Sequence, residues 1–181
     1  MRQRGILMTE PAGPLGRYAP VDPPSQRPAE PKVAVHLLGL PLPLLAASRE
    51  HHDELMREFR LMALANAVPS NAAPRRLLEL VQVLGVQYAG QVQRPNEEIE
   101  AALTRGDSSI DVTYEVTANV ADAARMLEAL MQEADEYCAA EQLLTLARTP
   151  SMVEFARWYL RNFIDQIDGA APQRWNGPTS P

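Results

Sequence analysis

The clearest structural pattern in the chain lies in residues 110–136, which read IDVTYEVTANVADAARMLEALMQEADE. Residues Ile110–Val116 have the pattern of a short strand. A turn that begins with Thr117 follows, Asn119 can cap a helix, and apolar residues then recur at helical spacing for about four or five turns. This stretch therefore predicts a β-α unit.

The same pattern returns 32 residues later as LLTLARTPSMVEFARWYLRNFIDQID, over residues 143–168. Without any gap, Val112–Glu136 can be laid over Leu144–Asp168. The identical pairs in this overlay are Thr113 with Thr145, Thr117 with Thr149, Ala124 with Ala156 and Arg125 with Arg157. We expect a second strand at Leu143–Ala147, a helix capped by Ser151, and parallel strands with a right-handed connection. The two matched arginines are expected to make equivalent contacts, with Asp122 and Glu154 or with the strand ends.

The segments before this repeat predict one more strand and several helices. An apolar, β-branched run at Val33–Leu38 predicts a strand, which Gly39 and Pro41 end. The expected helices span 44–66, run from Pro74 towards Tyr88, and occupy 96–105, the last being short, acidic and capped by Asn96. The predicted fold is α/β or α+β in two layers, with three short strands, repeated β-α units and amphipathic helices on one face.

Composition divides the 181-residue chain into one domain with two tails. Seven of the 16 prolines fall in the first 31 residues, so 1–31 is expected to be a disordered tail, and Met8 is an alternative start to Met1. The expected domain is 32–169. Residues 170–181 are expected to form a flexible tail, in which Trp175 can pack back on the domain.

Charge and hydropathy exclude several classes of partner. The segment 32–169 carries 12 basic and 20 acidic residues, a net charge of −8, which argues against a nucleic-acid partner. There is no run of eighteen apolar residues and no secretory signal, so we expect no membrane partner and a cytoplasmic protein. A lone cysteine, Cys138, excludes an internal disulfide and a thiolate metal site. No cofactor motif is present.

One histidine cluster, His51-His52-Asp53, is the weak candidate for a metal site. Adjacent histidines point about 100° apart on a helix and cannot share one metal, so a solvated helix face is the competing interpretation. His36 lies in the first predicted strand and is expected to be half-buried with a hydrogen-bond partner. No catalytic residue is predicted.

Two other groups are candidates for partner binding. Arg75 and Arg76 lie in the first turn of a helix, where their charge opposes the helix dipole, so an acidic partner can offset it. The second group is an aromatic stripe on the last predicted helix, which belongs either to the core or to an interface, including one between two copies of the chain. Its members are Phe155, Trp158, Tyr159 and Phe163.

Residues 143–157, LLTLARTPSMVEFAR, resemble the opening strand and first helix of bacterial anti-sigma serine kinases of the histidine-kinase-like ATPase type. The downstream ExxxN and DxGxG motifs of those kinases are missing, so ATP binding does not carry over. With SREHHDELMREF at 48–59 and WYL at 158–160, the chain also resembles a family of small regulatory proteins of high-GC Gram-positive bacteria. That resemblance implies an association with anti-sigma kinases and their antagonists.

Two functional hypotheses follow. The first is a non-catalytic cytoplasmic regulator that acts by protein–protein contact in sigma-factor partner switching, with a protein partner and a possible homodimer; it predicts an exposed apolar patch and no enclosed polar pocket. The alternative is a small-molecule or metal-responsive sensor or hydrolase that uses the region of His51 and His52. That alternative requires these side chains to converge in a concave pocket.

Overall fold

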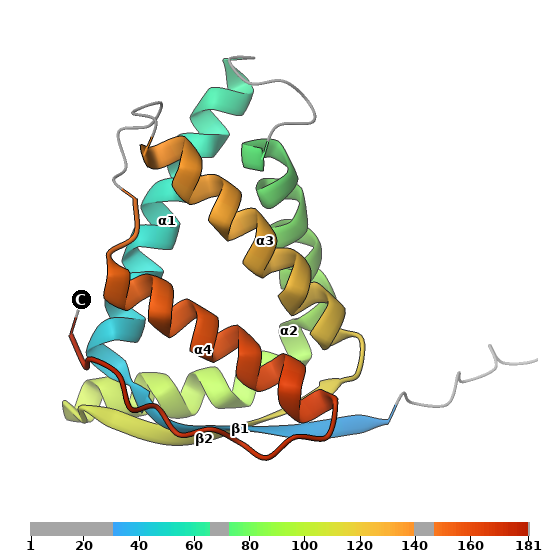
Figure 1. Ribbon diagram of the computed structural model, residues 1–181, viewed down its shortest axis with the longest axis vertical. Helices are drawn as coiled ribbons and strands as arrows, with labels where there is room; N and C mark the ends of the chain where they lie inside the picture. Colours follow the sequence, from blue (N-terminus) through green and yellow to red (C-terminus); the bar gives the residue numbers. More distant parts are fainter. Residues whose placement is uncertain (1–30, 66–72, 140–146, 181) are drawn as a thin grey trace, which may run out of the picture.

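The computed structural model describes residues 31–65, 73–139 and 147–180, apart from the side chains of Ala73, Tyr137 and Cys138. The described elements are, in chain order, β1 (Lys32–Pro41), α1 (Leu42–Leu64), α2 (Ala73–Arg105), β2 (Ser109–Thr117), α3 (Val120–Ala139) and α4 (Pro150–Ile167) (Figure 1). Helices and strands are therefore mixed, and the described part of the chain has an α+β architecture.

The two strands pair antiparallel, with Val35 opposite Tyr114. One bulge interrupts the pairing, because Leu38 and Gly39 together lie opposite Asp111. Gly39 has φ +70°, a left-handed conformation that glycine adopts without strain, and its N–H donates to the Asp111 carboxylate. A Cβ at this position would also lie only 3.0 Å from Nη1 of Arg174. The left-handed conformation therefore favours glycine here, and a larger residue would also have to displace the end of the flexible Arg174 side chain.

One face of this sheet is covered and the other is open. Buried and exposed side chains alternate along most of β2, and in β1 buried Val35 and Leu37 alternate with less buried neighbours, as expected for a sheet with one solvated face. Figure 1 shows α4 and the last part of α2 on the same side of the sheet. In the described elements these helix segments therefore pack on one face of the two-stranded sheet (Figure 1). The buried strand residues are Val35, Leu37, Leu40, Val112, Tyr114 and Val116.

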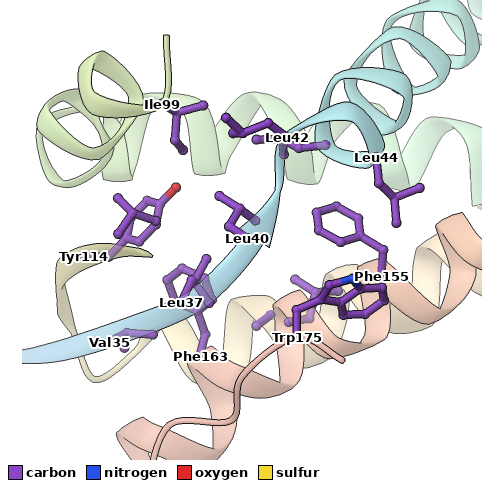
Figure 2. Close-up of a cluster of buried hydrophobic side chains, with 14 of the residues drawn as sticks. Val35, Leu37, Leu40, Leu42, Leu44, Ile99, Tyr114, Phe155, Phe163 and Trp175 are labelled. Atoms are coloured by element: carbon purple, nitrogen blue, oxygen red, sulfur yellow. The ribbon is translucent and has the colours of Figure 1, made fainter. Parts of the chain in front are cut away.

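Two separate groups of buried side chains form the core. The first, between the sheet, α2 and α4, includes Leu37, Ile99 and Phe155 and is drawn in Figure 2. It extends to Trp175, whose ring lies across Phe155 with the ring centroids 5.9 Å apart. The second group joins α1, α2 and α3 farther from the sheet. Its members are Leu55, Met56, Phe59, Leu77, Leu130 and Ala134.

The free edge of β1 is covered by a side chain from α4. The Gln166 amide accepts a hydrogen bond from the His36 backbone N–H and donates one to the His36 carbonyl, both at 2.9 Å. Gln166 is only 6% exposed and also donates to Oδ1 of Asn162 at 3.0 Å. Gln166 thus gives β1 the two hydrogen bonds that a neighbouring strand would supply, and it fixes α4 to the sheet.

Residues after α4 continue along the same edge. The backbone N–H of Trp175 donates to the Leu38 carbonyl at 2.9 Å, and Leu38 forms a single parallel bridge with Arg174. The Trp175 side chain is buried, as the sequence allowed, so this part of the predicted tail contributes to the core.

Helix α2 differs from the prediction. The sequence indicated one helix ending near Tyr88 and another capped by Asn96, but a single helix runs through both, with Pro95 inside it. In Figure 1 the helix changes direction, so that its last part lies over the sheet. A proline within a helix removes one backbone hydrogen bond and favours a bend, which explains how one helix serves both positions.

The predicted three strands and repeated β-α units are not confirmed. The described residues contain a two-stranded sheet, and residues 143–146 of the proposed third strand lie outside the described residues, as do 1–30 with the candidate starts. Both helices of the proposed repeat, α3 and α4, are present. The cap of α4 is Thr149 rather than Ser151, because Pro150 takes the first helical position and the Thr149 hydroxyl accepts from the Met152 N–H at 3.3 Å.

The two arginines matched in the repeat, Arg125 and Arg157, do not make the equivalent contacts that were expected. Arg125 pairs with Asp122 at 2.9 Å, as expected, and with Asp168 at 2.7 Å. No ion pair or hydrogen bond joins Arg157 to another described residue.

Replacing Gln166 with leucine should test the cover over β1. Gln166→Leu keeps the side-chain size but leaves the His36 N–H and carbonyl without these partners, so the free energy of unfolding should fall by about 2 kcal/mol. Urea denaturation measures this change, and hydrogen exchange should show a less protected His36 amide. The matched control is Gln132→Leu, at an exposed position on α3. Equal stabilities of the two variants would contradict a stabilising role for the hydrogen bonds between Gln166 and His36.

Candidate functional site

Residues of the four helices and of β2 line a partly open cavity of about 640 Å³ between the two parts of the core. Its walls are mainly apolar. On the sheet side it meets Leu45, Tyr114 and Phe155 of the first core group, and on the opposite side it meets Leu55 and Leu77 of the second. The cavity is therefore bounded by both core groups.

Small residues on three helices make room for this cavity. They are Gly85 and Ala89 on α2, Ala123 and Ala124 on α3, and Ala156 on α4. Gly85 and Ala89 are four residues apart and so lie on one face of their helix. Larger side chains at these positions would narrow the space between the helices.

A few polar side chains also reach the cavity. Ser48, Arg49, His51 and His52 come from one stretch of α1 because residues three and four apart share a helix face. Asp135 from α3 and Arg148, which precedes α4, face the same cavity. A mainly apolar cavity with a small number of polar groups is the usual form of a small-molecule site.

Both arginines of the cavity already have acidic partners. Arg148 holds Asp135 through two nitrogens, with Nη2–Oδ2 at 2.6 Å and Nε–Oδ1 at 3.0 Å, and its side chain is only 10% exposed. Arg49 pairs with Glu100 at 2.6 Å and donates to Asn96 at 3.4 Å. Neither guanidinium is therefore left without an anion.

Two buried polar atoms of the cavity lack a hydrogen-bond partner among the described residues. They are Oγ of Ser48 and Nε2 of His51. The two residues are one helical turn apart and both line the cavity. Both atoms have almost no accessible surface, so they lie behind the cavity wall rather than open to its interior.

Burial controls the titration of the cavity histidines and tyrosines. It lowers the pKa of His51 below its ordinary 6.5, and the Arg148 guanidinium lowers that pKa further. Burial also lowers the pKa of His52, against the opposing effect of Asp53. Between Tyr159 and Tyr114 the hydroxyls are hydrogen-bonded at 3.2 Å. Burial raises the pKa of both tyrosines above 10.0. At neutral pH these four side chains are uncharged.

The structure places the predicted candidates His51, His52 and Asp53 among the residues that line the cavity. Within residues 31–65, 73–139 and 147–180, no three histidine, cysteine or acidic side chains gather closely enough to hold a metal ion. Ser48 and His51 do not hydrogen-bond each other either, so they are not arranged as nucleophile and base. His36, outside the cavity, contacts Oγ1 of Thr113 through Nδ1 at 2.9 Å, as expected for a half-buried histidine.

The aromatic stripe on α4 belongs to the core. Phe155 and Phe163 are buried, while Trp158 and Tyr159 are partly buried and pack against the first core group. Trp158 also donates from its ring nitrogen to the Gln173 carbonyl at 3.0 Å. These contacts favour the core alternative for the stripe over an exposed interface.

The two arginines proposed as partner contacts have partners within the chain. Arg76 pairs with Glu133 of α3 at 2.6 Å. Arg75 donates to the Ala63 carbonyl near the end of α1 at 3.2 Å. Their charges therefore help to join α2 to its neighbouring helices.

Sequence reasoning missed the cavity itself. Its histidines were identified, but most of its wall residues were assigned to an ordinary core because their helical spacing is the same in both cases. The feature of the sequence that could have indicated the cavity is the pair of small residues at helical spacing on α2, Gly85 and Ala89.

A second, more polar hollow of about 470 Å³ lies between α3 and α4 and shares Arg148 and Asp135 with the cavity. Arg125, Arg157 and Arg161 contribute to its wall.

Comparison with protein-family models, with curated proteins and with solved structures finds no match for this chain. None of the helices in the described segments has the length and apolar character needed to cross a bilayer.

The two cavity histidines should make stability depend on pH. Because their pKa values are lower in the folded chain, the unfolded chain binds more protons below about pH 6.5. The free energy of unfolding should therefore fall as the pH drops from about 7 through 6.5, and level off below the folded-state pKa values. Denaturant titrations across this window measure the effect.

A variant with His51→Gln and His52→Gln lacks both protonation sites. Its stability should change less over the same pH window, while the carboxylates, which titrate lower, are shared by both proteins. Parallel curves for the variant and the unmodified chain would show that these histidines do not cause the dependence.

Proposed function

We propose that the chain is a non-enzymatic cytoplasmic protein that binds a small, mainly apolar molecule in the cavity bounded by α1, α2, α3, α4 and β2. The observation that carries this proposal is the cavity of about 640 Å³ with mainly apolar walls. Ligand pockets commonly have volumes of about 300–1,000 Å³ and mostly apolar walls. The proposal keeps the small-molecule sensor and omits the metal and the hydrolase of the sequence-based alternative.

The division of the core supports a binding role. Interiors are normally close-packed, with few spaces larger than a water molecule. Here Leu77 of one core group and Tyr114 of the other face the same space. A molecule in that space would contact both groups and so join the sheet side of the fold to its far end.

Binding would stabilise the arrangement of the four helices, because a ligand that binds the folded chain alone shifts the folding equilibrium. That coupling is how a small molecule could control a regulatory protein. The regulatory role itself, in sigma-factor partner switching with an anti-sigma kinase or its antagonist, remains a proposal, as does a homodimer.

A surface for such contact is available away from the aromatic stripe. Leu61 and Leu64, at the end of α1, are 61% and 81% exposed, and Val86 of α2 is 81% exposed. Val83 and Met126 are also more than half exposed, whereas Phe155 and Phe163 are buried.

The binding proposal can be tested with diphenylhexatriene, a fluorescent hydrocarbon without hydrogen-bonding groups. The purified chain should raise its fluorescence with saturation near one molecule per chain, and the probe should raise the unfolding temperature. Ala123→Trp places a large ring in the cavity wall and should weaken probe binding at least about tenfold by filling the space.

Met126→Trp is the matched control, because Met126 lies one turn further along α3, is 56% exposed and does not line the cavity. This variant should bind the probe as the unmodified chain does. Absence of saturable binding, or equal binding by both tryptophan variants, would refute the cavity as the site.

A further inference from the structure

The polar hollow between α3 and α4 carries more positive than negative charge. Its wall holds four arginines and only two acids, in a chain whose net charge is −6. With about 470 Å³ it has the size of a small-molecule pocket, and a concave surface with an excess of positive charge attracts small anions. The charged residues of its wall are Arg125, Arg148, Arg157, Arg161, Glu128 and Asp135.

Two of these arginines are already held by acids. The Arg148 guanidinium binds Asp135 through two nitrogens and is largely buried. Arg125 lies between Asp122 and Asp168, with nitrogen–oxygen distances of 2.9 and 2.7 Å. Both guanidiniums therefore have their anions within the chain, and we assign them no ligand.

The other two arginines, Arg157 and Arg161 of α4, are less well matched. They are four residues apart, so they lie on one face of the helix, where like charges repel each other. Arg161 pairs with Glu128 at 3.4 Å, a long contact, and its side chain is 55% exposed. Arg157 is exposed and forms no ion pair or hydrogen bond with another described residue. Glu154, three residues before Arg157, does not line the hollow.

A phosphate group suits this pair of arginines. At neutral pH a phosphate monoester carries about −1.5 to −2 charges, which two guanidiniums can neutralise. Its oxygens accept the paired N–H groups of arginine, and its charge would offset the repulsion between the two side chains. A single carboxylate brings only about half of that charge. Because the chain as a whole is acidic, an anionic bilayer would repel it, whereas a small soluble molecule can enter the hollow.

We infer that the hollow between α3 and α4 binds the phosphate group of a small soluble molecule through Arg157 and Arg161. Neither arginine lines the apolar cavity, so this inference goes beyond the proposed function and does not depend on it.

An NMR titration of the full chain with inorganic phosphate, at an ionic strength held constant with sodium chloride, tests the inference. The backbone amides of α3 and α4 around the hollow should shift and reach saturation. Acetate should bind at least about tenfold more weakly, because it brings less charge. Detecting binding directly avoids the general stabilisation of folded proteins by phosphate.

A variant with Arg157→Gln and Arg161→Gln removes both proposed ligand contacts. It should bind phosphate at least about tenfold more weakly than the unmodified chain. The matched control is Arg57→Gln with Arg60→Gln, which removes the same charge from two exposed positions of α1 outside the hollow. This control should bind phosphate as the unmodified chain does. All four positions are exposed, so both variants should stay folded.

Several outcomes would overturn the inference. They are a titration without saturation, shifts confined to other elements, equal binding by the two variants, and acetate binding as strong as that of phosphate. Cosedimentation with phosphatidic acid vesicles without binding of free phosphate would also overturn it, because the phosphate would then belong to a membrane. Binding of diphenylhexatriene in the cavity is measured separately, so failure of one site leaves the test of the other intact.

Discussion

The structure depends on how an exposed strand edge obtains hydrogen-bond partners. A two-stranded sheet has two open edges, and β1 has residues whose N–H and carbonyl groups point away from β2. Gln166 supplies both partners to His36 from a helix, and the backbone of Trp175 supplies one to Leu38. These bonds position α4 over β1, which places Phe155 and Phe163 in the core.

The cavity can be understood from the same constraint. The last turns of α4 are fixed by Gln166, and the last part of α2 is brought over the sheet by the bend near Pro95. The other helix segments pack around a second group of apolar residues farther away, including Phe59 and Leu77. Small side chains such as Ala123 do not fill the space that this division leaves. The cavity is thus a consequence of packing the described elements around two separate apolar groups.

The local elements could be predicted from the sequence because they depend on local patterns. Val33–Leu38, Ile110–Val116 and the helix after Pro150 show the expected alternation or helical spacing. The course of α2 could not be predicted, because Pro95 and Asn96, which commonly mark a helix boundary, lie within one continuous helix. The candidate site was found only in part: His51 and His52 were identified by their chemistry, whereas the cavity depends on distances between helices that spacing does not encode.

The contacts of β1 also determine when the fold can be completed. Its partners are Thr113, Gln166 and Trp175, which follow it by roughly half the chain and by nearly the whole described length. Such distant pairings slow folding, because a long loop must close before they form. During synthesis β1 leaves the ribosome early. The edge that Gln166 and Trp175 cover in the folded chain lacks these partners until residue 175 has emerged. A chain that stalls before this residue would carry an uncovered strand, the kind of surface that chaperones protect from aggregation.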